Sequence, residues 1–272
     1  MLASRNSSVF QEELSATPSS GNKTGQGALI INADDWGLDS ATTNCILDCI
    51  RCGAVSSTSA MVFMQDSDRA AIIAIAEGID AGLHLNLTTL FTGPRLPATL
   101  LRHQEKLVRF LTRNRFARLL YHPGLTRSFQ YVVAAQLEEF RRLYKAEPRR
   151  VDGHHHMHLC ANILLSDLLP AGTIARRNFS FQAGEKSLAN RIFRKATDAI
   201  LAKHHRTTDY FFSLPPLQPV GRLEHIVDLA RHSVVEMETH PYNAEEYQFL
   251  TAGGLRDLAK DVPIASGYQL AL

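Results

Sequence analysis

The chain contains 272 residues, of which 45% are hydrophobic and 21% are charged, and its formal net charge is +2. This length and apolar content suffice for one large hydrophobic core, and α/β barrels of this size commonly form a single domain. Because the net charge is small, it gives no reason to expect binding to nucleic acid or to a membrane surface. No apolar run reaches the roughly 18 residues of a spanning helix, so we expect no integral membrane segment.

The first 27 residues differ in composition from the rest of the chain. They are rich in Ser, Thr, Gly and Asn, which predicts a disordered N-terminal segment and a single catalytic domain over residues 28–272. Glu12 and Glu13 lie in this segment, and it contains no apolar run that could serve as a secretion signal. We therefore expect a cytoplasmic protein.

The four cysteines agree with a reducing compartment. Cys45, Cys49 and Cys52 are spaced to share one face of a helix, where three thiolates could in principle bind zinc. The core interpretation is favoured, because buried cysteine is common and no nearby fourth ligand completes the set. Cys160 has no assigned role.

Apolar runs typical of strands alternate with amphipathic, helix-like stretches along the chain. Strands are expected near 28–31, 54–63, 81–87, 149–155, 173–181, 210–214, 234–239 and 263–265. Helices are expected from Ser40 to Gly53 and near 66–77, 99–121, 128–144, 162–169, 186–205, 223–231 and 255–260. Seven or eight strands alternating with helices favour an α/β fold with a parallel (β/α) barrel over a helical or all-β fold.

The segment 151–159 holds four of the twelve histidines in five positions, a density that points to a metal site. If the segment continues a strand, His154 and His156 share one face and His155 lies on the other. If it has become a helix, His154 and His158 are stacked. In either geometry at most two or three imidazoles reach one ion, so further ligands must come from elsewhere.

Other polar side chains fall in or at the ends of the predicted strands. Asp34 and Asp35 end the first strand, His84 lies in the third, His154 ends the fourth and His240 ends a late one. In a parallel barrel these ends meet at one rim, where enzymes of this fold build their sites. Each residue also has a structural interpretation: a turn or helix cap for the Asp pair, a core histidine for His84 and a loop histidine for His240. Together, the set favours a functional site.

These residues form ordered motifs. The segments 32–37 (NADDWG), 82–85 (GLHL), 152–158 (DGHHHMH) and 240–241 (HP) resemble, in this order, motifs of the YdjC-like carbohydrate deacetylases, which include chitooligosaccharide deacetylases. The resemblance covers about residues 28–272. It implies a distorted (β/α) barrel with a divalent metal ion, Mg or Zn, and an enzyme that removes N-acetyl groups from sugars.

Carried over position by position, the resemblance also implies roles for individual residues. Metal ligands would be Asp35, His84 and His154, with Asp34 as general base and His240 as the candidate acid. Trp36, where the family usually has Phe, is assigned to substrate binding together with His156 and His158. His155 and His158 also have a structural interpretation. The segment 175–178 only loosely matches the Arg-containing stretch that often follows the His cluster.

The chemistry of these residue types agrees with hydrolysis. Two imidazoles and one carboxylate leave positions open on a divalent ion, where water is acidified and an amide carbonyl is polarised. The same ligand set occurs in non-haem iron oxygenases, although those sites usually lie in β folds, and a non-catalytic sugar- or metal-binding relative is a third alternative.

The expected partner is an N-acetylated carbohydrate that is converted to acetate and a free amino sugar. The sequence leaves open the sugar, its chain length and attachment to lipid, the metal and the oligomeric state, including a homo-oligomer. A helix containing Lys186, Arg191, Arg194 and Lys195 is expected to present a solvated basic face.

Overall fold

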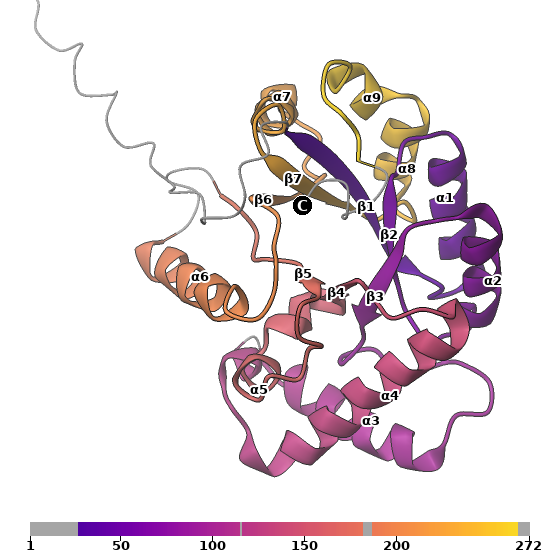
Figure 1. Ribbon diagram of the computed structural model, residues 1–272, viewed down its shortest axis with the longest axis vertical. Coiled ribbons are helices and arrows are strands. Elements are labelled where there is room, and N and C mark those ends of the chain that lie inside the picture. Colours follow the sequence, from indigo (N-terminus) through magenta and orange to yellow (C-terminus); the bar gives the residue numbers. More distant parts are fainter. Residues whose placement is uncertain (1–26, 115, 182–186, 266–272) are drawn as a thin grey trace, which may run out of the picture.

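The computed structural model describes residues 27–114, 116–181 and 187–265. Its seven strands form one parallel sheet in the order β5-β4-β3-β2-β1-β7-β6. The sheet curls into part of a barrel, and helices pack around its outside (Figure 1). β5 and β6 are the two edges, so the barrel is open between them. The prediction of a distorted parallel (β/α) barrel is confirmed.

The strands are short, apart from β1 and β7. They are β1 (Ala28–Trp36), β2 (Ser57–Ala60), β3 (Ala81–Leu85), β4 (Arg150–Gly153), β5 (Ile174–Ala175), β6 (Tyr210–Ser213) and β7 (Val234–Thr239). All nine residues of β1 are buried, because this strand lies at the centre of the sheet between β2 and β7. Residues at the carboxyl ends of these strands therefore share one rim.

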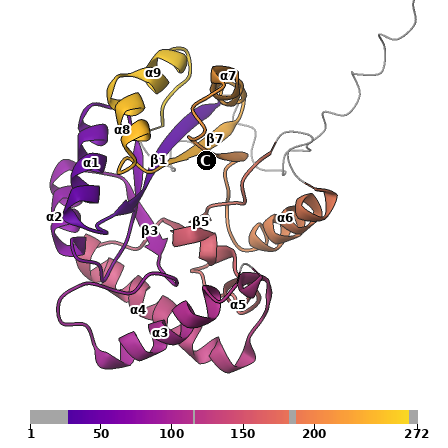
Figure 2. The same cartoon turned by 180° about the vertical axis from the view of Figure 1, so that it is seen from behind.

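Helices connect the strands and cover the sheet from outside, as both views show (Figure 2). The α-helices are α1 (Ser40–Arg51), α2 (Ser67–Glu77), α3 (Ala98–Leu111), α4 (Thr126–Tyr144), α5 (Ala161–Leu165), α6 (Leu188–Leu201), α7 (Val220–Leu229), α8 (Ala244–Thr251) and α9 (Gly254–Leu258). Short 3₁₀ helices are η1 (Ala117–Leu119), η2 (Pro123–Leu125) and η3 (His154–Leu159). Within the described residues, no helix is both long and apolar enough to cross a membrane.

Several predicted boundaries were wrong. The helix expected over 99–121 ends at Leu111, where the polar run from Thr112 to Asn114 begins, and the chain continues in 3₁₀ turns. The strand expected over 173–181 is limited to β5, because the Arg176 side chain is drawn into the barrel and the backbone then leaves the sheet. Ile264 makes only an isolated bridge to Leu29, and α8 was not anticipated. The expected disorder of residues 1–26 lies outside the described part of the chain.

Candidate functional site

Three predicted ligands meet at the carboxyl rim of the sheet. Asp35 lies at the end of β1, His84 in β3 and His154 directly after β4. The Oδ1 atom of Asp35 is 3.3 Å from His84 Nε2 and 2.9 Å from His154 Nδ1. One ligand atom from each residue falls within 4.8 Å of the others, a spacing that permits a shared metal ion. The structure thus brings together residues that are distant in sequence.

Asp35 is held in an unusual position for a strand residue. Its φ of 70° is left-handed, and the pairing of β1 with β2 shifts register between Ala33 and Trp36, so the side chain turns toward the histidines. Its Oδ1 atom is buried and makes no hydrogen bond of acceptable geometry. A buried carboxylate oxygen in this state is costly unless a cation satisfies it. The three side chains therefore fit a divalent metal ion.

The charges around Asp35 favour its ionised form. Burial by itself raises the pKa of Asp35, but the imidazoles of His154 and His84 outweigh burial and hold the pKa below its usual range. For His84, burial lowers the pKa, whereas the carboxylates of Asp34 and Asp152 raise it well above its ordinary value. The rim is thus strongly negative around these imidazoles, a condition that favours a bound cation.

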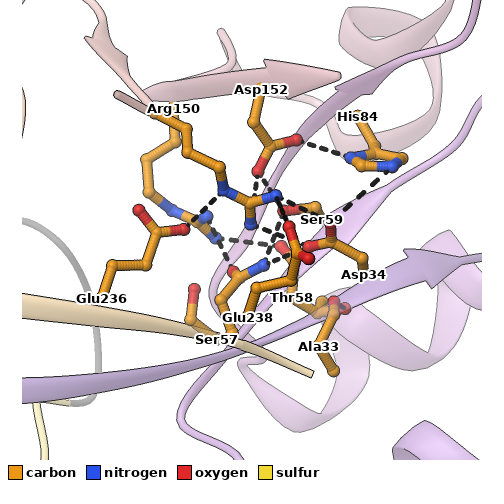
Figure 3. Close-up of polar contacts among 12 residues, drawn as sticks. Ala33, Asp34, Ser57, Thr58, Ser59, His84, Arg150, Asp152, Glu236 and Glu238 are labelled. Carbon is orange, nitrogen blue, oxygen red and sulfur yellow. Dashed lines mark hydrogen bonds and ion pairs between the residues drawn. The ribbon is translucent and has the colours of Figure 1, made fainter. Parts of the chain in front are cut away.

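His84 is oriented by a second carboxylate. Asp152 Oδ1 lies 2.6 Å from His84 Nδ1, and the other oxygen of Asp152 accepts a hydrogen bond from Ser59 Oγ at 2.5 Å (Figure 3). This contact occupies Nδ1 and leaves Nε2 facing Asp35. Metal-binding histidines are commonly fixed in this way by a carboxylate on the remote ring nitrogen.

Asp34 is bound by a buried arginine that the sequence analysis did not identify as functional. Arg176, directly after β5, donates from Nη1 to Asp34 Oδ2 at 2.7 Å and from Nη2 to Asp34 Oδ1 at 2.8 Å. Asn32 Nδ2 donates to the same Oδ1 at 2.8 Å. Both carboxylate oxygens are therefore fixed, with Oδ2 3.9 Å from His84 Nε2.

Arg176 also binds three further carboxylates. Its Nη2 lies 2.9 Å from Asp152, its Nε 2.7 Å from Glu236 and its Nη1 3.1 Å from Glu238. Burial lowers the pKa of Arg176, but Asp152, Asp34 and Glu236 outweigh this effect and raise it well above its ordinary value. The guanidinium therefore remains charged and is surrounded by four buried carboxylates.

Glu238 differs from its neighbours because its carboxyl group is held toward the protonated form. Burial raises its pKa well above the usual range, and the nearby Asp34 adds to this effect, while Arg176 opposes it. His156 Nε2 lies 3.6 Å from Glu238 Oε2. Ligand atoms of Asp34, Glu238 and His240 also fall within 4.8 Å of one another. His240 therefore lies beside Asp34, at the rim where the strand ends meet.

The His cluster adopts neither of the two geometries considered from sequence. Residues 154–159 form the 3₁₀ segment η3, in which His155 and His156 have left-handed φ values of 54° and 58°. The rings of His154 and His155 remain packed, with centroids 4.0 Å apart, but their polar contacts differ. His154 contacts Asp35, while His155 Nδ1 lies 3.0 Å from Thr88 Oγ1. A Cβ atom at Gly153 would lie 2.8 Å from His158 N, so the turn requires glycine there.

The three residues assigned to substrate binding lie in different environments. Trp36 is completely buried and its Nε1 donates to Ala70 O at 3.2 Å, so its indole packs between β1 and α2 and offers no surface to a ligand. His158 is also completely buried, and its Nε2 contacts Arg176 O at 2.8 Å. Both residues are structural in this arrangement, which corrects their assignment to the substrate surface.

His156 is the one of these three that lines an open pocket. Its ring packs edge-on against Phe179 at 4.7 Å, and Phe179 stacks on Phe211. The pocket encloses about 600 Å³, including its open mouth, and lies between the rim and α6. Its lining also includes Arg118, Leu119, Leu159, Asn178, Asn190, Phe193 and Arg194. Burial lowers the pKa of His156 well below its ordinary value, and the charge on Arg176 adds to this effect.

Sequence reasoning missed Arg176, Asp152, Glu236 and Glu238 as members of the site. A signal was present for the two glutamates, because they alternate on a buried strand and must point to the same face. Asp152 gave a similar signal, as a carboxylate on a strand predicted to be buried. The signal for Arg176 was weak, because the segment 175–178 only loosely matches the family's Arg-containing stretch and an arginine after a short strand usually reaches solvent.

Comparisons with known proteins identify relatives of this chain. A family model described as YdjC-like protein matches residues 28–261. Chitooligosaccharide deacetylases from Escherichia fergusonii and Yersinia pestis strain Pestoides F are 29% identical over 138 residues and 31% identical over 136 residues. Each alignment covers 50% of this chain and 52% of the relative, so the chain spans about half the length of the curated relatives it matches.

One solved structure shares the fold over nearly the whole chain. A protein from Enterococcus faecalis V583, described as a cellobiose-phosphate cleavage protein, superposes with a TM-score of 0.63. The superposition covers 91% of this chain and 100% of the other, at 19% sequence identity. At this level of identity the likeness shows the fold alone.

Proposed function

This chain belongs to the YdjC-like protein family, and from that premise we propose that it is a metal-dependent carbohydrate deacetylase. The reaction is hydrolysis of an N-acetyl group on an amino sugar or oligosaccharide, with release of acetate. One observation carries the proposal: Asp35, His84 and His154 converge at the rim, while a separate carboxylate, Asp34, is fixed beside them. The curated relatives named as chitooligosaccharide deacetylases support the same reaction class.

The proposed metal ligands are Asp35 Oδ1, His84 Nε2 and His154 Nδ1. A divalent ion held there supplies Lewis acidity toward a water molecule and an amide carbonyl. Asp152 keeps the His84 ring oriented, because it binds the remote nitrogen. Two histidines and one carboxylate leave positions open for substrate.

Asp34 is the proposed general base. Its two oxygens accept hydrogen bonds from Arg176 and Asn32, but a carboxylate has about four lone-pair sites and retains acceptor capacity. The bidentate contact with Arg176 fixes the direction of the carboxylate, so the proton acceptor does not have to reorganise during the reaction. Asp34 then removes the proton of the attacking water.

His240 is the proposed general acid. Its ring lies within the group that contains Asp34 and Glu238, and its backbone N–H donates to Glu246 Oε2 at 2.8 Å, which anchors the loop after β7. An amine leaving group needs a proton, because expulsion of an unprotonated amide nitrogen is very unfavourable. An imidazole is suited to this transfer near neutral pH.

Acetate release from a panel of N-acetylated sugars, measured with different added divalent metals, tests the proposal. The wild-type protein should release acetate, and Asp35→Ala should lose metal and activity together. Asp34→Asn should retain metal while turnover falls by about 100- to 10,000-fold. Metal binding with oxygen consumption in place of acetate release would identify an oxygenase, and binding without turnover would identify a non-catalytic relative.

A further inference from the structure

Exposed apolar side chains are concentrated in two neighbouring segments of the surface. Among the described residues, eight of the fifteen exposed large apolar side chains come from residues 116–121 and 181–193. The most exposed of these include Leu120 at 58%, Leu188 at 69% and Ile192 at 59%. Both segments line the pocket next to His156, so they lie side by side. A concentration of this kind usually marks an interaction surface.

The helix α6 is oriented with apolar residues toward solvent. Thr197 and Leu201 are buried on its inner side, whereas Leu188 and Ile192, one turn apart, are exposed. A helix on the surface of a globular protein normally directs its apolar stripe toward the core. In both overall views α6 stands at the periphery of the molecule, beyond the open edge of the sheet (Figures 1 and 2).

Cations outnumber carboxylates on the same surface. The described residues of 112–125 and 187–197 contain no Asp or Glu, and their cations are Arg113, Arg118, Arg191, Arg194 and Lys195. The carboxylate that follows on α6, Asp198, is paired with Arg177 and Asn178. Burial lowers the pKa of Arg194, and the charge of Arg118 adds to this effect, while Asp198 opposes it. The charge of the chain is therefore unevenly distributed, and this region is basic although the net charge of the whole chain is small. We call this region, with its exposed Leu120, Leu188 and Ile192, the basic-apolar face.

We propose that the basic-apolar face docks on an anionic lipid bilayer. The exposed leucines and isoleucine would enter the boundary between headgroups and acyl chains, and the arginines and Lys195 would contact lipid phosphates. The combination of aliphatic side chains with flanking cations is the pattern of helices that lie in the membrane surface. Docking in this orientation would place the pocket lined by His156 beside the lipid headgroups.

A second copy of this chain fits the face less well. In a two-fold symmetric dimer the same patch meets itself, so the cations of one copy would oppose those of the other, because Asp198 is already paired with Arg177. An anionic bilayer satisfies both the apolar area and the charge. The proposal goes beyond the proposed deacetylase activity, and it can be tested without substrate.

Co-sedimentation of the full chain with lipid vesicles tests docking. Vesicles of phosphatidylcholine alone are compared with vesicles of equal parts phosphatidylcholine and phosphatidylglycerol, at low and high salt. We expect binding to the mixed vesicles, weak binding to the neutral ones, and a decrease as salt rises. Leu188→Glu with Ile192→Glu should reduce binding by at least about tenfold, because two carboxylates replace the inserting side chains.

The matched control is Ile72→Glu with Ile75→Glu on α2. These isoleucines are 68% and 53% exposed, and α2 lies on the opposite side of the molecule from α6 in both views. The control adds the same charge and should bind the mixed vesicles as the wild type does. Wild-type protein that stays in the supernatant with mixed vesicles at low salt overturns the proposal. Equal loss of binding in both double variants also overturns it. The proposal fails too if the wild type self-associates without binding vesicles and the α6 variant removes that self-association.

Discussion

The guanidinium of Arg176 binds both carboxylate oxygens of Asp34, with Nη1 2.7 Å from Oδ2 and Nη2 2.8 Å from Oδ1. The two residues are 142 positions apart in the sequence, and both are almost completely buried. A planar guanidinium matches a carboxylate in this bidentate geometry, whereas an ammonium group cannot. The contact therefore fixes the proposed base and also neutralises part of the buried carboxylate cluster.

Arg176→Met should destabilise the fold strongly. Removal of one partner leaves the buried carboxylates uncompensated, a change that typically costs about 3–5 kcal/mol. Arg176→Lys should recover part of this stability, since it retains the charge without the bidentate geometry. Denaturant unfolding in excess chelator measures both variants. As a control, Arg51→Met breaks the exposed ion pair with Glu77 and should change the stability far less, because solvent screens that pair. An Arg176→Met protein as stable as this control contradicts the structural role.

Asp152→Asn should weaken metal binding while leaving the three proposed ligands in place. The amide cannot supply the negative charge that now contacts His84 Nδ1 at 2.6 Å, so the ring is less well oriented and less basic. Loss of such a partner typically lowers metal affinity by about 10- to 100-fold. Competition against a chromogenic chelator measures the change. Asp80→Asn is the control, because Asp80 contacts Ser57 and Arg150 instead of His84. The metal affinity of this variant should match that of the wild type.

His240→Ala should retain the fold and the metal but lose turnover on amides. Without a proton donor the amine leaves slowly, so the basic limb of the kcat/KM profile should change. The loss should be smaller on an O-acetyl ester, whose leaving group needs less assistance. Wild-type rates on both amide and ester would remove His240 from the reaction. His156 would then be the next acid to test, since it lines the pocket whereas His158 is buried.

His158 should make the fold sensitive to acid. Burial lowers the pKa of its imidazole from 6.5 to about 4, although the hydrogen bond to Arg176 O partly opposes this. As the pH falls from 6.5 toward 4, the unfolded chain takes up a proton that the folded protein does not, so stability falls. A shift of this size corresponds to roughly 3 kcal/mol at pH 4. Urea unfolding in excess chelator at pH 7 and pH 4 should show a smaller acid loss for His158→Asn than for the wild type. An equal loss would show that His158 makes no such contribution.

The sequence was sufficient to determine much of the fold, because local patterns decide where strands and helices occur. Apolar runs such as residues 28–31 and 234–239 predict buried strands from the local sequence alone. Alternation of these runs with amphipathic helices predicts a parallel sheet, and the rim of such a sheet gathers the residues at its strand ends. The proximity of Asp35, His84 and His154 follows from this rule alone.

Only the tertiary structure decided which further side chains complete the site. Arg176 lies after a strand of two residues, and nothing local indicates that it turns inward to meet four carboxylates from three other strands. The left-handed turn at His155 and His156 likewise depends on packing of His158 against Gly153. The exposed apolar side of α6 depends on how that helix rests on the barrel. Periodicity identifies an amphipathic helix, but contacts between distant segments decide which side is covered.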